Sequence, residues 1–192
     1  MFKVIQLLIL TLLISSCGMQ SIPTALNEVE AKWADVQNQF KRRADLIPNL
    51  VEIVKGYAKH EKETLTAVIE ARASATKINL SVDQLTPETM KKFQAAQGSL
   101  SGALSKLMVV SERYPELKAN ENFRDLQSQL EGTENRITVS RTRYIESIKR
   151  FNNLVTVPPT SWYNSMFLKH SKKPQFKVDN LEKVQDAPKV KF

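Results

Sequence analysis

The chain has 192 residues, a formal net charge of +8, five glycines and a single cysteine. One cysteine excludes an internal disulfide, so a hydrophobic core must hold the fold, and the low glycine content disfavours a turn-rich β protein. The positive charge favours an anionic partner, which for an exported chain is phospholipid, and we expect no nucleic-acid partner.

The N-terminus has the pattern of a lipoprotein signal. Lys3 precedes an apolar run over residues 4–14, which is shorter than the ~20 residues that span a bilayer. An aliphatic residue and two small residues then precede Cys17, as in a lipobox, where the thiolate accepts a diacylglyceryl group. We predict that residues 1–16 are a signal peptide and that acylated Cys17 binds membrane lipid. The alternatives are an ordinary secretory signal or a short membrane anchor.

Prolines divide the following part of the chain into four segments. The prolines that open or close them are Pro23, Pro48, Pro87, Pro115, Pro158 and Pro159. Proline is tolerated in the first turn of a helix and disfavoured inside one. Asp45, Thr86 and Asn120 stand where they can cap the starts of the later helices. The prolines therefore predict four helices.

In each segment, hydrophobic residues recur at spacings of three and four, which places them on one face of an α-helix. The faces expected to point inward are Ile22, Leu26, Val29, Trp33, Val36 and Phe40; Leu50, Val54, Tyr57, Glu61, Leu65, Val68, Arg72 and Ala75; Met90, Phe93, Gln97, Leu100, Leu104, Leu107, Ser111 and Tyr114; and Phe123, Leu126, Leu130, Thr133, Ile137, Ser140, Tyr144, Ile148 and Phe151. We predict an all-α fold, an antiparallel up-and-down four-helix bundle of long helices over residues 17–155. A long intermolecular coiled coil is the alternative, although its heptads would break at each proline. Within the third segment, Gly98 and Gly102 indicate either a close helix crossing or tolerance on an exposed face.

Two long motifs carry a family resemblance. The first is Lys41-Arg42-Arg43-Ala44-Asp45-Leu46-Ile47-Pro48-Asn49-Leu50-Val51, continued by Lys55-Gly56-Tyr57-Ala58, His60-Glu61 and Ala71-Arg72; the second is Glu112-Arg113-Tyr114-Pro115-Glu116-Leu117-Lys118-Ala119, followed by Phe123, Leu126, Thr133-Glu134-Asn135, Ile137, Arg141 and Tyr144. Over residues 26–192 the chain resembles the LemA family of bacterial envelope proteins. It departs from the family at Ile145, where asparagine is usual, and in its lipobox, where members commonly carry an uncleaved anchor. The resemblance implies a four-helix bundle and no established enzymatic activity, with some relatives linked to organising membranes.

Residues suited to catalysis or metal binding are few. Neither histidine follows a glutamate by three positions, as the ligands of a di-iron bundle would. We expect no catalytic residue, no metal and no cofactor; the alternative is a metal-dependent or hydrolytic enzyme that uses His60 and Glu61. A further set of charged and amide residues indicates either a hydrogen-bonded network that sets helix register or a ligand site. We expect Glu61 and Arg72 to be the most buried members of this set. This set is Arg42, Arg43, Asp45, Asn49, Glu61, Arg72, Glu134 and Arg141.

The function that we expect is that of a lipid-anchored, non-enzymatic envelope module with a protein partner that the sequence does not name. Gly18 after Cys17 favours the outer membrane where the cell has two membranes. In an up-and-down bundle, the connections around residues 45–48 and 114–120 share the end opposite the anchor. We expect a composite binding surface there; the alternative is that its residues only cap and stop helices. Its expected members are Arg43, Asp45, Asn49, Tyr114 and Lys118.

The C-terminal tail, residues 156–192, is rich in aromatic and basic residues. An even number of helices returns the chain to its starting end, so this tail is expected beside the anchor. Amphipathic aromatic rings suit lipid headgroups, and each lysine near an anionic surface adds ~1 kcal/mol. The residues expected at the membrane surface are Trp162, Tyr163, Phe167, Lys169, Lys172 and Lys173. The alternative is that the aromatic residues pack onto the helices while the end from Asp179 is disordered.

Overall fold

The computed structural model describes residues 20–176 of the chain. These residues form helices and no strand, so the all-α prediction is confirmed for them. The elements are α2 (Ser21–Tyr57), α3 (Lys62–Lys77), the 3-10 turn η1 (Val82–Gln84), α4 (Pro87–Ser111), α5 (Pro115–Ala119), α6 (Glu121–Thr156), α7 (Thr160–Tyr163) and the π-helical turn η2 (Asn164–Leu168). The predicted signal peptide, the acylation site Cys17 and residues 177–192 lie outside the described residues.

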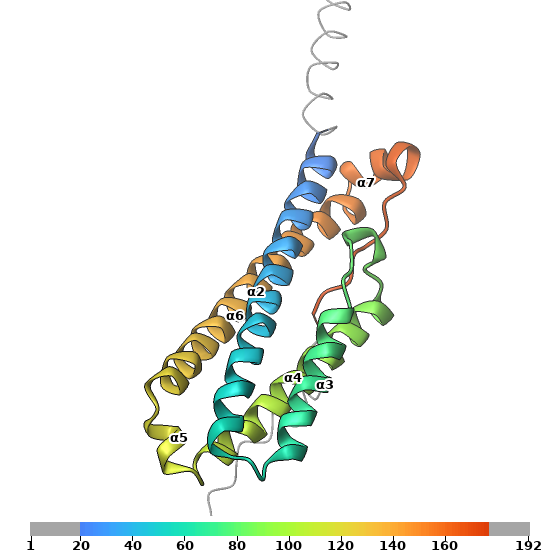
Figure 1. Cartoon of the computed structure of the whole chain (residues 1–192). Coiled ribbons are helices and arrows are strands. Elements are labelled where there is room, and N and C mark those ends of the chain that lie inside the picture. The colour runs from blue at the N-terminus through green and yellow to red at the C-terminus, as the bar shows by residue number, and fades with distance from the viewer. Residues whose placement is uncertain (1–19, 177–192) are drawn as a thin grey trace, which may run out of the picture.

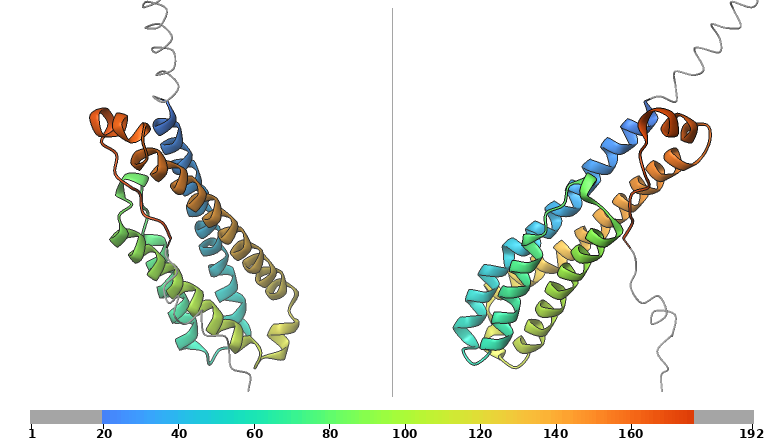
Figure 2. Two further views of the ribbon diagram at one scale, coloured as in Figure 1. Left: turned by 180° about the vertical axis from the view of Figure 1, so that it is seen from behind. Right: turned by 90° about the vertical axis from the view of Figure 1, so that its right-hand side faces the viewer.

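The two longest helices, α2 and α6, run antiparallel beside each other, and α3 and α4 form a shorter pair packed against α2 (Figures 1 and 2). The start of α2 and the helices α7 and η2 lie at one end of the molecule, which we call the α7 end. The α2–α3 turn and α5 lie at the opposite end, the α5 end. Between residues 20 and 176, no helix is both long and apolar enough to cross a membrane.

Pro48 does not end a helix as the sequence predicted. It lies inside α2, which is 37 residues long and continues to Tyr57. The predicted boundary at Pro48, the cap at Asp45 and the connection around residues 45–48 are therefore wrong. The chain turns at residues 58–61 instead, where the Ala58 carbonyl accepts a hydrogen bond from the Glu61 backbone at 3.1 Å. Tyr57 is consequently near a turn and 41% exposed, contrary to its predicted inward position.

A side chain from α3 explains how α2 tolerates this proline. Proline has no N–H group, so Pro48 cannot donate to the carbonyl four residues earlier, which belongs to Ala44. Ala44 is buried, and a buried carbonyl without a donor costs about 1–3 kcal/mol. The Nε atom of Arg72 donates to this carbonyl at 2.8 Å. Arg72 therefore replaces the missing helical hydrogen bond and fastens α3 to the middle of α2.

Two other helix starts agree with the sequence. Thr86 caps α4, because its hydroxyl accepts a hydrogen bond from the Thr89 backbone at 3.1 Å, and Pro87 occupies the first helical position. Asn120 caps α6 by accepting from the Phe123 backbone at 3.0 Å. The predicted caps Thr86 and Asn120 are confirmed.

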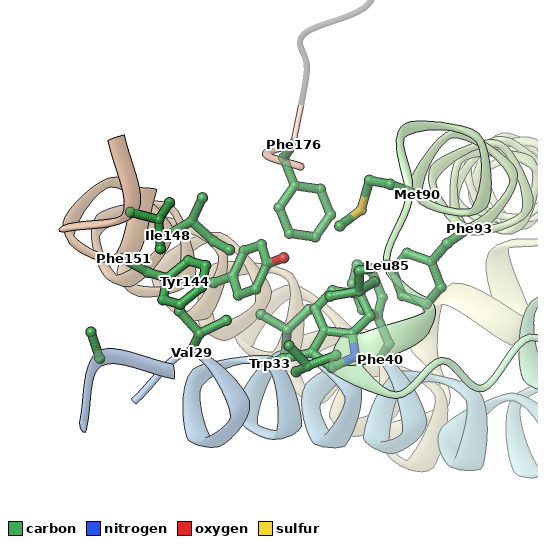
Figure 3. Packing of buried hydrophobic residues seen from close by; sticks show 14 of the residues in the cluster. Val29, Trp33, Phe40, Leu85, Met90, Phe93, Tyr144, Ile148, Phe151 and Phe176 are labelled. Carbon is green, nitrogen blue, oxygen red and sulfur yellow. The ribbon is translucent and has the colours of Figure 1, made fainter. Parts of the chain in front are cut away.

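The core divides into two clusters along the length of the molecule. The cluster towards the α7 end combines aliphatic side chains with a group of aromatic rings, in which Trp33 lies 5.3 Å from Phe93 and 5.2 Å from Tyr144 between ring centroids (Figure 3). Burial raises the pKa of the Tyr144 hydroxyl, which donates to the Pro174 carbonyl. The cluster towards the α5 end is mainly aliphatic and includes Leu50. The predicted inward positions of the fourth segment, from Phe123 to Phe151, are all buried.

Gly98 and Gly102 lie on an exposed part of α4. A Cβ atom added at either position would meet no neighbouring atom within 4 Å. The close helix crossing is therefore wrong at these positions, and the alternative of tolerance on an exposed face is confirmed.

We predict an energetic coupling between Pro48 and Arg72. Arg72→Met is expected to lower the free energy of unfolding by about 1.5–3 kcal/mol, because the Ala44 carbonyl loses a charged donor. In a Pro48→Ala background the backbone N–H of residue 48 supplies that donor, so Arg72→Met should cost at least about 1 kcal/mol less. Urea unfolding of the four proteins measures this difference.

The control for this coupling is Arg141→Met, because the Arg141 guanidinium lies 4.7 Å from the Phe176 ring and does not contact Ala44. Arg141→Met should lower the free energy of unfolding by the same amount in the wild-type and in the Pro48→Ala background. An Arg72→Met cost that is equal in the wild-type and the Pro48→Ala backgrounds would contradict the role assigned to Arg72.

Candidate functional site

Arg43, which was expected on the binding surface, is an interior residue of α2 and is 2% exposed. Its Nη1 donates to Glu134 Oε2 and to Ser101 Oγ, both at 2.9 Å, and its Nη2 donates to Gln97 Oε1 at 2.8 Å. These bonds join α2 to α4 and α6. A buried guanidinium needs such partners, so this arrangement matches the predicted network rather than an exposed ligand site.

The other members of the predicted network are used in different ways. Glu134 pairs with Arg43, Arg72 binds the Ala44 carbonyl, and Arg141 lies over the Phe176 ring. The side chains of three members form no hydrogen bond or ion pair with the described residues 20–176: Arg42, Asp45 and Asn49. The most buried charge is on Arg43, not on Glu61 or Arg72 as expected, because only Arg43 has partners from two further helices.

The expected composite surface is divided by the course of α2. Asp45 and Asn49 are exposed on the side of the helix, while Tyr114 and Lys118 lie at the α5 end. Asp45 precedes the end of α2 by twelve residues, which corresponds to about 18 Å of helix. The structure therefore brings Tyr114 and Lys118 together and leaves Asp45 and Asn49 apart from them.

Glu61 organises the α5 end. Its Oε1 atom accepts from Arg113 Nη2 at 3.0 Å and from the Tyr114 hydroxyl at 3.2 Å, which links the α2–α3 turn to the α4–α5 connection. Desolvation, and then the hydrogen bond to Glu61, raise the pKa of Tyr114. Beside this contact, Asn120 Nδ2 donates to the Tyr57 hydroxyl at 3.0 Å. The end of the molecule is thus closed by side chains from all three connecting segments.

The alternative enzyme site, His60 and Glu61, lies in the turn between α2 and α3. His60 is exposed in the turn, and Oε1 of Glu61 is engaged by Arg113 and Tyr114. Within residues 20–176, no three acidic, histidine or cysteine side chains come close enough to hold a metal ion. The groups that this arrangement presents are an exposed imidazole and an exposed guanidinium beside a hydrogen-bonded carboxylate and phenol.

The α7 end presents apolar side chains to solvent. Trp162 of α7 is 67% exposed, and Met166 and Phe167 of η2 are 70% and 64% exposed. The helices α7 and η2 lie at the same end of the molecule as the start of α2 (Figures 1 and 2). Tyr163 is half-buried, with its ring centroid 5.0 Å from that of Phe167. Side chains of this kind at one end of a helical protein form a candidate lipid contact.

The lysines of the tail differ in their exposure to solvent and in their contacts. Lys169 and Lys172 are exposed, whereas Lys173 Nζ donates to the Val82 carbonyl at 3.1 Å and pairs with Asp83 at 3.3 Å. Further along, Phe176 is buried against Trp33 and Tyr144 (Figure 3). The two alternatives for the tail thus apply to different parts of it: most side chains of residues 162–169 are exposed, and Lys173 and Phe176 pack on the body.

The sequence did not predict several side chains that bind Arg43 and Glu61, namely Gln97, Ser101 and Arg113. Gln97 was assigned to the inward face of its helix, and a polar residue at such a position is a usable signal for a buried hydrogen-bond partner. Ser101 and Arg113 gave no comparable signal, because serine and arginine are common on exposed helix faces.

The sequence model of the LemA family matches residues 32–192. The chain belongs to the LemA family. Its similar relatives include the protein LemA of Metamycoplasma hominis, 26% identical over 72% of this chain and 58% of the relative. They also include magnetosome protein MamQ of Magnetospirillum gryphiswaldense, 22% identical over 71% and 56%, and magnetosome protein MamQ 2 of Paramagnetospirillum magneticum, 23% identical over 80% and 62%. The LemA-like region thus spans under two thirds of the length of these relatives.

Proposed function

We propose that this LemA-family protein is a lipid-anchored, non-enzymatic module of the bacterial envelope. In this proposal Cys17 carries the acyl chains. The helices form one antiparallel up-and-down bundle, and its α7 end contacts the membrane. The observation that carries the proposal is the position of Trp162, Met166 and Phe167. They are exposed at the end where α2 begins, four residues after Cys17.

The length of α2 supports a function that extends away from the membrane. Its 37 residues correspond to about 55 Å of helix. With the α7 end at the lipid, the α5 end would stand that far into the envelope compartment. We propose that the envelope protein partner binds there, on the surface formed by Tyr57, Arg113, Tyr114 and Lys118. In a cell with two membranes, the outer membrane is the proposed location, because Gly18 follows Cys17.

The lipid anchor is tested by Cys17→Ser. Two or three acyl chains, at ~0.8 kcal/mol per buried CH₂, hold a protein stably on a membrane. The variant is expected to lose metabolic labelling with alkyne-palmitate and to appear as an unprocessed or soluble protein on electrophoresis and fractionation. Ser15→Ala is the control, since it keeps a small residue before the cysteine and should leave labelling intact. Unchanged labelling and membrane association of Cys17→Ser would refute the lipobox.

The membrane contact of the α7 end is tested with liposomes and unlipidated protein that begins at Gly18, so that neither acyl chains nor the apolar run of residues 4–14 contribute. Co-sedimentation is expected with phosphatidylglycerol vesicles, with weaker binding at high salt, because Lys169 and Lys172 add ~1 kcal/mol each near an anionic surface. Trp162→Ser combined with Phe167→Ser should lower binding at least tenfold. Val109→Ser is the matched control, because Val109 is 69% exposed on α4. Binding that is insensitive to the double substitution, or to salt and anionic lipid, would leave the tail with a packing role only.

The partner surface is tested by photo-crosslinking in cells. A crosslinking residue at position 118, at the α5 end, is expected to capture one envelope protein, and the same residue at Lys149 on the exposed side of α6 should not. Arg113→Glu should reduce the capture without a change in fractionation, because it reverses the charge of an exposed guanidinium. Capture that is equal from positions 118 and 149, or unchanged by Arg113→Glu, would place the partner elsewhere.

A further inference from the structure

A cavity of about 580 Å³ opens on the side of the molecule between α2, α3 and α4. It lies between the two ends to which the proposed function assigns the membrane and the partner. Its walls come from the middle of α2, the second half of α3 and the segment that follows α3. A volume of this size is within the range of sites for small organic ligands.

The inner wall of the cavity is apolar. Phe40 of α2 and Phe93 of α4 line it, with their ring centroids 5.2 Å apart in an edge-to-face arrangement. Ile78, in the segment after α3, lines it as well. An apolar or aromatic body of a ligand would contact these three side chains and be removed from water.

The rim carries two cations that the described part of the protein does not neutralise. Arg72 uses Nε for the Ala44 carbonyl, which orients its guanidinium, and its two Nη atoms have no hydrogen-bond partner within residues 20–176. Lys41 also lines the cavity and has neither a hydrogen bond nor an ion pair there. A guanidinium held by its own Nε presents the remaining N–H groups as a preorganised donor pair for a carboxylate.

One acidic residue limits the charge of the ligand. Asp45 lies on the same lining, one helical turn after Lys41, and has no ion pair within the described residues. The rim therefore has two positive charges and one negative charge. This balance favours a monoanion over a dianion such as a phosphate monoester, because the Asp45 carboxylate repels added negative charge.

We propose that this cavity binds a small organic monocarboxylate, with the carboxylate at Arg72 and Lys41 and an apolar body against Phe40, Phe93 and Ile78. The site is separate from the α7 end and from the proposed partner surface. It gives the Arg72 side chain a second role, since the bond from Nε to the Ala44 carbonyl leaves both Nη atoms for the carboxylate.

The probe for this site is 1-naphthoate, titrated into the protein by calorimetry, with the uncharged 1-naphthamide as the matched ligand. Saturable binding of 1-naphthoate is expected, with at least tenfold weaker binding of the amide. Lys41→Met should weaken 1-naphthoate at least tenfold without a change in thermal stability, because the exposed Lys41 side chain makes no hydrogen bond or ion pair with residues 20–176 that would be lost. Lys106→Met is the control, since Lys106 is exposed on α4 outside the cavity lining.

Position is checked by the NMR signal of the Trp33 indole N–H, which donates to the Leu80 carbonyl two residues beyond Ile78. Its resonance should shift as 1-naphthoate saturates the protein. No saturable binding, equal binding of acid and amide, or full binding in Lys41→Met would overturn the proposal. Binding of 1-naphthyl phosphate as tight as that of 1-naphthoate would overturn the assignment to a monocarboxylate.

Discussion

The hydrogen bond from Arg72 to the Ala44 carbonyl allows α2 to continue through Pro48. Because α2 continues, it reaches 37 residues and matches the 36 residues of α6, so the two helices can pair along their whole length. The turn into α3 is thereby moved to the α5 end, where Glu61 meets Arg113 and Tyr114. This side-chain contact thus stabilises α2 at the point where it passes Pro48, and the continuation of α2 sets the length of the molecule and places Glu61 at the α5 end.

The two core clusters and the Arg43 network between them are stabilised by different physical interactions. Aromatic rings around Trp33 and Tyr144, together with aliphatic side chains, fill the part towards the α7 end, and mainly aliphatic side chains fill the part towards the α5 end. Between them Arg43 binds acceptors on α4 and α6, and its buried charge is satisfied only where those acceptors stand within hydrogen-bond distance. At the surface, the α7 end exposes the apolar side chains Trp162, Met166 and Phe167, while the α5 end carries the ion pairs Glu61–Arg113 and Glu112–Lys118.

The sequence correctly predicted those parts of the fold that depend on residues close together in the chain. Thr86 and Asn120 cap helices through backbone groups three residues away, and the inward face of α6 follows from a spacing of three and four. The prediction at Pro48 was wrong because the donor that replaces its N–H comes from a residue 28 positions from Ala44. No pattern within the first segment could indicate that donor. The candidate surface failed to assemble for the same reason, since it assumed a connection where α2 continues.

By itself, the sequence determined that the described chain is helical, which faces of its helices are buried and which family it belongs to, because periodicity, caps and motifs are properties of short stretches. Only the tertiary structure decided that Arg43 is interior and that Phe176 packs beneath Arg141 while Trp162 stays in solvent. Each of these outcomes depends on which side chains from distant segments meet. The free energy of burying a charge or a ring is set by those partners and not by its neighbours in the chain.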